Sequence, residues 1–143
     1  MKLKTEYNIE KDKLEIDKLT SRFFDLFTNK DNKIPNVKDI KTIFIKEGMI
    51  INNTNGKPLI YDLESFIKPR EEMLSNGTLT DFSESEVSNE TQIFGNVAQR
   101  FCHYEKSGKL NNEYFESEGK KTIQFIKINE EWKMTYVAWS DKK

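Results

Sequence analysis

The sequence predicts an α+β domain in which helices cover one face of a bent antiparallel sheet. The first part of the chain has apolar residues at three- and four-residue spacing, which is typical of an amphipathic helix. The second half has four long runs rich in β-branched and aromatic residues, and turn-forming residues separate them. Helices followed by a series of antiparallel strands are typical of the α+β class.

The first predicted helix begins at Ile9. Its apolar stripe consists of Ile16, Leu19, Phe23, Phe24, Leu26 and Phe27. The stretch TNKDNKIPN, residues 28–36, ends the helix because it is rich in turn formers and contains a proline. We expect residues 1–8 to be a flexible amino-terminal segment of a single domain that spans 1–143.

The middle of the chain predicts a short helix, a hairpin and a second long helix. A helical piece over 37–42 leads into a strand over 42–52, and the Asn55-Gly56 turn connects this strand to a short one, LIY. Asp62 is the predicted N-cap of the second long helix. We expect a break or kink at Pro69, which lacks a backbone donor, and an end at Asn76-Gly77.

The rest of the chain predicts four long strands, over 78–94, 96–106, 113–128 and 131–140. The predicted turns between them are Phe94-Gly95-Asn96, KSGKLNN at 106–112 and NEE at 129–131.

Charge and composition argue against several partners. The chain has 23 basic and 24 acidic residues and no basic patch, so we expect no nucleic-acid partner. The amino-terminal stretch has no apolar run between its charges, so we expect neither a signal peptide nor a membrane partner. The single cysteine agrees with a reducing compartment, and a cytoplasmic location is the expectation.

The stretches FGNVAQRFCHYEK (94–106) and GKKTIQFIKINEEWKMTYVAWS (119–140) share a recognisable order. A turn and Val-Ala open one long strand, a Thr-containing strand reaches a turn and a Trp, and the last strand ends in an aromatic residue and Ser. This order resembles the nuclear transport factor two-like superfamily, with its SnoaL-like, ketosteroid isomerase-like and scytalone dehydratase branches. Residues 27–50 resemble the family's helix, short helix and first strand, so the resemblance spans nearly the whole chain in element order.

The resemblance implies a cone, in which a strongly curved, mixed and mainly antiparallel sheet wraps the first helix as a half-open (cystatin-like) barrel. A pocket would lie at the open end. Alternation places Trp132, Met134, Tyr136 and Ala138 on one face of the last strand and Val137 and Trp139 on the other. The resemblance assigns the first face to the interior. It implies that a second copy of the chain covers Val137 and Trp139, which predicts a homodimer.

We expect the pocket to be mostly apolar and to hold a small hydrophobic molecule. Its expected lining is Phe24, Ile50, Asn52, Arg100, Tyr104, Ile123, Phe125, Trp132, Met134 and Tyr136. Arg100 is expected either to bind a ligand carboxylate or to pair with Glu84 or Glu86 on a neighbouring strand. Tyr104 and Tyr136 either donate to a ligand or are packed with satisfied hydroxyl groups.

The catalytic residues of the isomerase branch have no counterparts at the matching positions. Its general base would fall near Asn52, its protonated carboxylic acid near Ile123, and its tyrosine at Phe23 or Phe24. Proton transfer next to a carbonyl needs a base and an oxyanion donor within hydrogen-bond reach. Whether the chain is an enzyme therefore stays open.

His103, the only histidine, is the candidate catalytic residue. It would serve as the base of a dehydratase, isomerase or cyclase acting on a hydrophobic carbonyl substrate. The more ordinary interpretation is a strand histidine on a sheet face or in a dimer interface. By alternation His103 and Arg100 face opposite sides, so they do not both face the pocket.

Other polar residues favour ordinary structural roles. The acidic stretch 81–90 suggests a general acid or a metal site, but we expect its carboxylates to be solvated. We expect Cys102 to pack as a small apolar side chain. One histidine and one cysteine are too few for a zinc site, so we expect no metal and no cofactor. A protein-interaction module is the third hypothesis, beside ligand binding and catalysis.

Overall fold

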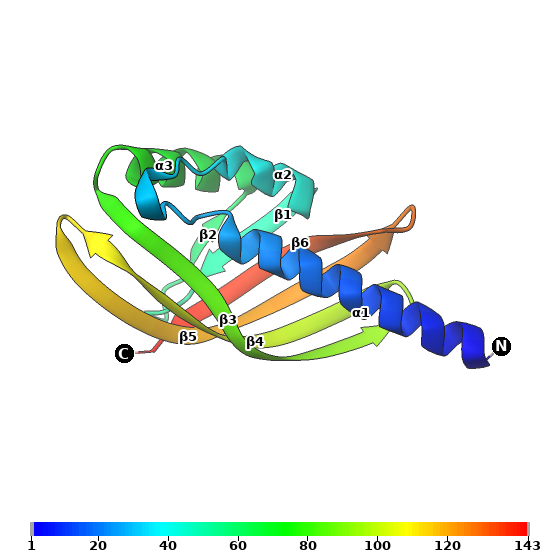
Figure 1. Cartoon of the computed structure of the whole chain (residues 1–143). Helices are drawn as coiled ribbons and strands as arrows, with labels where there is room; N and C mark the ends of the chain where they lie inside the picture. Colours follow the sequence, from blue (N-terminus) through cyan, green and yellow to red (C-terminus); the bar gives the residue numbers. More distant parts are fainter. Residues whose placement is uncertain (1, 143) are drawn as a thin grey trace.

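The computed structural model describes residues 2–142, with side chains from Ile9 onward. In Figure 1 a curved sheet forms one layer, and the long helix α1 (Lys2–Asp25) crosses its concave side. Helix α3 (Leu63–Ser75) and the short α2 (Ile40–Ile43) lie above one end of the sheet. The α1 helix begins before the predicted Ile9, so residues 2–8 of the segment expected to be flexible are helical; Met1 lies outside the described residues.

The described residues form one six-stranded mixed sheet in the order β2-β1-β6-β5-β4-β3. Its strands are β1 (Phe44–Asn52), β2 (Leu59–Tyr61), β3 (Leu79–Phe94), β4 (Val97–Leu110), β5 (Glu113–Ile128) and β6 (Glu131–Asp141). The β1–β6 pair is parallel and the other pairs are antiparallel. This arrangement confirms the α+β class and the cone-like, half-open sheet around α1.

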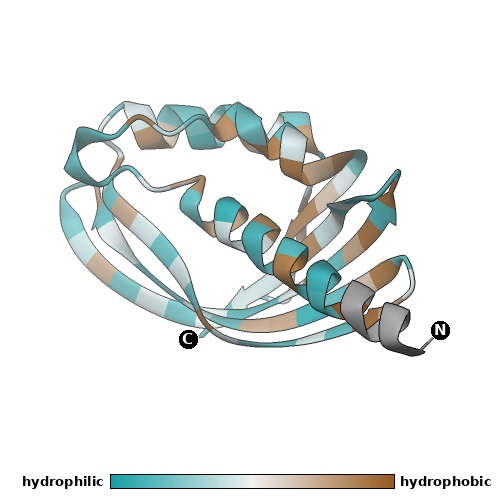
Figure 2. Ribbon diagram, turned by 45° about the vertical axis from the view of Figure 1, so that its right-hand side comes forward, coloured by the Kyte–Doolittle hydropathy of each residue, from teal (hydrophilic) through white to brown (hydrophobic). Residues whose placement is uncertain are grey.

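The predicted apolar stripe of α1 packs against the concave face of the sheet. Ile16, Leu19, Phe23, Phe24 and Phe27 are all buried. Figure 2 shows hydrophobic and hydrophilic residues alternating along α1 and along the strands, as expected of elements with one face in the core. Within residues 2–142, none of the helices has both the length and the apolar character needed to cross a bilayer.

A buried carboxylate fixes α1 to the sheet. Asp12 accepts a hydrogen bond of 3.0 Å from the Trp132 indole nitrogen and lies 2.8 Å from the Lys127 ammonium. Because Trp132 is on β6 and Lys127 on β5, this contact sets the angle at which the helix crosses those strands.

Asn29 joins three elements just after α1. Its side-chain amide donates to the carbonyl oxygens of Leu74 (3.0 Å) and Leu79 (2.7 Å), and its oxygen accepts from the Phe82 amide at 2.7 Å. The buried Asn29 thereby satisfies backbone groups at the end of α3 and the start of β3 that have no partners within those elements. It holds α3 close to the mouth of the sheet.

A β-bulge in β6 changes which of its side chains face inward. In the β5–β6 ladder Gln124 pairs with Tyr136 and Phe125 with Met134, so Thr135 is an extra residue. Met134 and Val137 are fully buried on either side of it, whereas Tyr136 is 37% exposed. The prediction that Tyr136 faces inward, with Val137 and Trp139 outward, is therefore wrong beyond Met134.

Two boundary predictions also need correction. The α3 helix continues through Pro69 without a break. Because Pro69 has no backbone N–H, the carbonyl of Ser65 has no hydrogen-bond donor in the helix. Both residues are exposed, so water can solvate this carbonyl. The turn predicted over 106–112 is limited to two residues, Asn111 and Asn112, because β4 extends to Leu110 and β5 begins at Glu113. Their positive φ values of 52° and 69° suit a two-residue hairpin turn.

Candidate ligand-binding cavity

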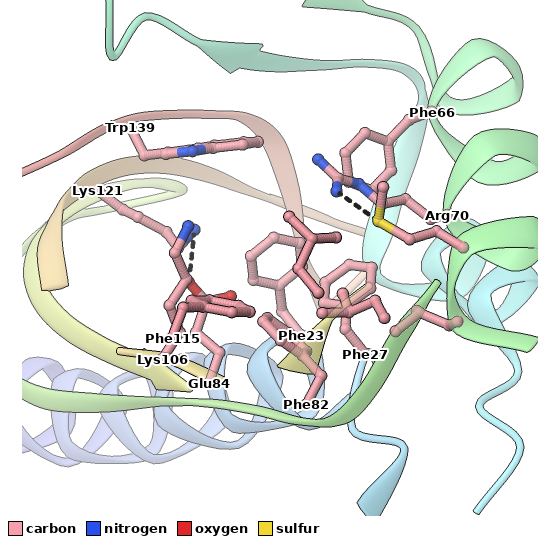
Figure 3. A pocket seen from close by; sticks show the side chains of 14 residues that line it. Phe23, Phe27, Phe66, Arg70, Phe82, Glu84, Lys106, Phe115, Lys121 and Trp139 are labelled. Atoms are coloured by element: carbon pink, nitrogen blue, oxygen red, sulfur yellow. Dashed lines mark hydrogen bonds and ion pairs between the residues drawn. The ribbon is translucent and has the colours of Figure 1, made fainter. Parts of the chain in front are cut away.

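A cavity of about 290 Å³ lies between the helices and the sheet, at the end where α3 covers the cone (Figure 3). The helices and the turn after α1 contribute Phe23, Phe27, Phe66, Arg70, Met73 and Leu74. The strands contribute Leu79, Phe82, Glu84, Lys106, Leu110, Phe115, Lys121 and Trp139. Most of these side chains are apolar, and many are aromatic.

The aromatic wall is built from rings in edge contact. Phe27 lies edge-on to Phe23, with centroids 5.6 Å apart, and to Phe66, with centroids 5.9 Å apart. Phe82 and Phe115 face each other from β3 and β5 at 6.5 Å. Such pairs hold their rings in defined positions, so the wall has a fixed shape.

Lys121 carries a buried charge at the sheet side of the cavity. Its side chain is only 4% exposed, and its ammonium lies 3.2 Å from the Glu84 carboxylate. The same ammonium sits 4.4 Å from the Tyr104 ring centroid and 4.3 Å from that of Trp139, which are cation–π distances. Burial lowers the pKa of Lys121, while the nearby Glu84 carboxylate opposes that shift.

A second charged pair lies beside the first. The Lys106 ammonium is 2.9 Å from the Asp141 carboxylate, which also accepts a hydrogen bond from the Tyr104 hydroxyl. Burial and this hydrogen bond raise the pKa of Tyr104. Partial burial alone would raise the pKa of Asp141, but the Tyr104 and Lys106 contacts hold it below the ordinary 3.8.

The position of Tyr104 requires a glycine at 119. A Cβ atom there would overlap the Tyr104 hydroxyl and the Ser140 carbonyl oxygen.

Arg70 brings a further cation into the cavity from α3. Its guanidinium carbon lies 4.9 Å above the Phe66 ring centroid, and its Nη1 is 3.9 Å from the Met73 sulfur. In Figure 3 the guanidinium extends from α3 toward the side of the cavity where Trp139 and Lys121 lie. Burial lowers the pKa of Arg70, and electrostatic interaction with Tyr61, Glu84 and Asp141 opposes this shift.

Solved structures with the same architecture identify the fold. A nuclear transport factor 2 (NTF2-like) superfamily protein from Salmonella enterica superposes with a TM-score of 0.76 at 15% identity, covering 94% of each chain. An NTF2-like protein of unknown function from Prochlorococcus gives 0.70 at 20% identity, covering 92% of this chain and 93% of the other. An NTF2-like protein with a cystatin-like fold from Novosphingobium aromaticivorans gives 0.73 at 11% identity, with coverage of 96% and 86%.

The chain has the NTF2-like fold. No family model and no curated protein sequence matches it. At these identities the likeness to solved structures establishes the architecture, and the site must be argued from its own residues.

The NTF2-like cone buries most of the predicted pocket residues without placing them around this cavity. Phe24, Ile50, Arg100, Tyr104, Ile123, Phe125, Trp132 and Met134 are buried, but none lines it. Asn52 organises a turn, in which its side chain accepts from the Thr54 amide at 3.1 Å and hydroxyl at 2.8 Å. Tyr136 lies on the outer face. The physical reason is that α1 fills this part of the cone, so the cavity lies under α3 instead.

Of the two roles that the sequence allows for Arg100, the structure shows the pairing with a carboxylate on a neighbouring strand. Its guanidinium forms a two-pronged contact with Glu86, at 2.8 and 2.5 Å, and lies 2.7 Å from Asp17 on α1. Glu86 and Glu84 therefore face inward, and the expectation that they are merely solvated is wrong. Because two carboxylates already satisfy Arg100, it is not free to bind a ligand carboxylate.

His103 lies on the outer face of β4. Its neighbours Cys102 and Tyr104 are buried, whereas the His103 side chain is 25% exposed and its closest charged partner is Glu118, at 3.9 Å. It therefore points away from the cavity, and the proposal of His103 as a base acting inside the cone is wrong. Cys102 packs as expected, and burial raises the pKa of its thiol to about 12.

Two features of the sequence indicate residues that line this cavity. Lys121 has the same parity as the apolar Ile123 and Phe125, which predicts an inward lysine. Arg70 is four residues after Phe66 and three before Met73, on the apolar stripe of α3. Among residues 9–142, no group of three or more metal-binding side chains is placed to hold an ion.

Proposed function

We propose that this chain binds a small, largely apolar molecule in the cavity under α3. The observation that carries the proposal is a cavity of about 290 Å³ walled mainly by aromatic and aliphatic side chains, with Arg70, Glu84, Lys106 and Lys121 as its charged lining. Small-molecule sites are typically concave and apolar with a few polar groups that orient the ligand, and their volumes begin at about 300 Å³.

Binding explains the charged residues at the cavity better than catalysis does. Lys121 and Lys106 each have a carboxylate partner within 3.2 Å, so neither is poised as a free base or nucleophile. Glu84 is held by Lys121, and His103 is on the other face of the sheet. These contacts support a binding protein.

A cavity-filling variant tests the proposal. Met73 lines the cavity, and Met49 is exposed on the outer face, so Met73→Trp and Met49→Trp form a matched pair. The probes are naphthalene-2-carboxylate and its uncharged isostere 2-naphthamide, measured by calorimetry and by thermal shift. We expect the wild type and Met49→Trp to bind at least one probe and Met73→Trp to lose it. If neither probe binds the wild type, or if Met73→Trp binds as tightly as the wild type, the proposed site is wrong.

We also propose that two copies of the chain pair through the outer face of the sheet, by residues other than Val137 and Trp139. Five residues that pair successively across strands β2, β1, β6, β5 and β4 form a row on this face: Ile60, Ile51, Ala138, Thr122 and Phe101. Ile60 and Phe101 are largely exposed, and Met49 and Tyr136 extend the apolar area next to the row. An apolar row of this kind supports pairing with a second copy, whose net charge of −1 gives little repulsion.

A further inference from the structure

We infer that the molecule held in this cavity carries a carboxylate, which pairs with the guanidinium of Arg70. The inference rests on the proposed binding function and specifies the chemical class of the ligand.

Charge pairing within the cavity singles out Arg70. The Lys121 ammonium is matched by Glu84 at 3.2 Å, and the Lys106 ammonium by Asp141 at 2.9 Å. Among the charged side chains of residues 9–142, none lies within 4.0 Å of Arg70 as an ion-pair partner. The charged lining of the cavity therefore has one positive charge without a counterpart.

The surroundings of Arg70 are unfavourable for an isolated charge. Its polar atoms have the Met73 sulfur as a neighbour at 3.9 Å, and a thioether is only a weak acceptor. The Phe66 ring supplies a cation–π contact but no hydrogen-bond acceptor. A partly desolvated guanidinium gains most from an anion with two oxygens in a plane, because its nitrogen–hydrogen groups form a matching fork.

The rest of the cavity defines the body of the ligand. Phe23, Phe27, Phe82, Phe115 and Trp139 present ring faces and edges to the same space. Flat aromatic groups pack well against such a wall, and a volume of about 290 Å³ limits the ligand to one or two fused rings with a short substituent. The combination points to a small aromatic carboxylate.

Calorimetry with the isosteric pair naphthalene-2-carboxylate and 2-naphthamide tests this inference. The variants are Arg70→Met and, as a matched control, Lys68→Met, which removes an exposed cation from the same helix. We expect the wild type and Lys68→Met to bind the carboxylate at least about tenfold more tightly than the amide. In Arg70→Met we expect carboxylate binding to weaken about tenfold or more and amide binding to change by about threefold or less.

Two outcomes would overturn the inference while leaving ligand binding intact. One is equal binding of the two probes by the wild type, and the other is an Arg70→Met variant that weakens both probes equally or neither. If Arg70→Met does not fold, the affinities of the wild type for the carboxylate and the amide still decide whether the ligand charge matters. Arg70→Lys adds a test, because it keeps the positive charge but loses the paired N–H donors of the guanidinium. Failure of both probes to bind the wild type would instead contradict the proposed function itself.

Discussion

Lys121 shows how a charged residue is accommodated in the interior of this chain. Its ammonium is held by the Glu84 carboxylate and lies between the rings of Tyr104 and Trp139. Ion pairing and cation–π contact together offset the loss of hydration that burial imposes. Removing either partner leaves the other charge in a site that water reaches poorly.

We predict that Lys121→Met lowers the free energy of unfolding by about 3 kcal/mol, because it leaves Glu84 buried without its counter-charge. The double variant Lys121→Met/Glu84→Met removes both charges and should be clearly more stable than Lys121→Met. Urea unfolding of the wild type, both single variants and the double variant measures the coupling. Additive losses from the two single changes would contradict a direct ion pair.

Acid sensitivity is predicted at Asp141. The pKa of Asp141 is held below the ordinary 3.8 in the folded chain, so the unfolded chain takes up this proton first as the pH falls. The stabilisation by Asp141 is therefore fully present at pH values above its unfolded pKa of 3.8, and it is lost as the pH falls through the lower pKa of the folded chain. We expect the stability difference between wild type and Asp141→Asn to be largest near neutral pH and to shrink below about pH 4.

The measurement for Asp141 is unfolding free energy against pH. Glu105→Gln is the matched control, because Glu105 is exposed and has no ion pair among the described residues. Its stability should follow the wild type at every pH. A constant difference between wild type and Asp141→Asn across the acid range would show that the carboxylate contributes no pH-dependent stability.

At the scale of elements, the junction at Asn29 decides where the cavity can form. Its side chain bridges the last turn of α3 and the first residues of β3, and Leu74, Leu79 and Phe82 on these elements all line the cavity. The cavity therefore depends on a short connection whose side chain replaces missing backbone partners.

We predict that Asn29→Ala lowers the free energy of unfolding by about 3 kcal/mol, because it leaves two carbonyl oxygens and one amide buried without partners. It should also weaken whichever naphthalene probe binds, since α3 loses its attachment. Chemical unfolding and calorimetry measure the two effects. Asn36→Ala is the control, because Asn36 is exposed in the same connection and should change stability by about 0.5 kcal/mol or less. If Asn29→Ala and Asn36→Ala change the unfolding free energy and probe binding equally, Asn29 does not have this role.

At the scale of the whole molecule, the curved sheet separates two surfaces of different character. Its concave face holds α1 and the cavity, and its convex face presents the apolar row that includes Phe101 and Ile60. Trp139 belongs to the concave face, so a charged substitution there would disturb the cavity and not an interface.

We predict that the wild type sediments as a dimer and that Phe101→Asp is a monomer with the wild-type circular dichroism spectrum. The reason is that Phe101 is 51% exposed within the apolar row, where a buried carboxylate would have no partner. Tyr114→Asp is the control, because Tyr114 is 64% exposed at the start of β5 beside the hairpin turn. It should stay dimeric. A dimeric Phe101→Asp would exclude this face, and a monomeric wild type would exclude the dimer.

Sequence alone determined the order of elements, the apolar stripe of α1 and the inward parity of Arg100, Cys102 and Tyr104. These features follow from local periodicity, which the chain expresses whatever its surroundings. The cone did not follow from periodicity; it was implied by the resemblance of residues 94–106 and 119–140 to the NTF2-like superfamily. Periodicity also places Arg70 and Lys121 on inner faces, although it cannot say which charges have partners.

The tertiary structure alone decided the site. The extra residue Thr135 bends β6 and reverses its alternation, so Trp139 enters the cavity and Tyr136 leaves the interior. Glu84, Glu86 and Asp141 neutralise Lys121, Arg100 and Lys106 across strands, which leaves Arg70 unmatched among the described side chains. Bulges and cross-strand pairs depend on how a sheet curves around its core, and that curvature comes from contacts between residues far apart in the chain.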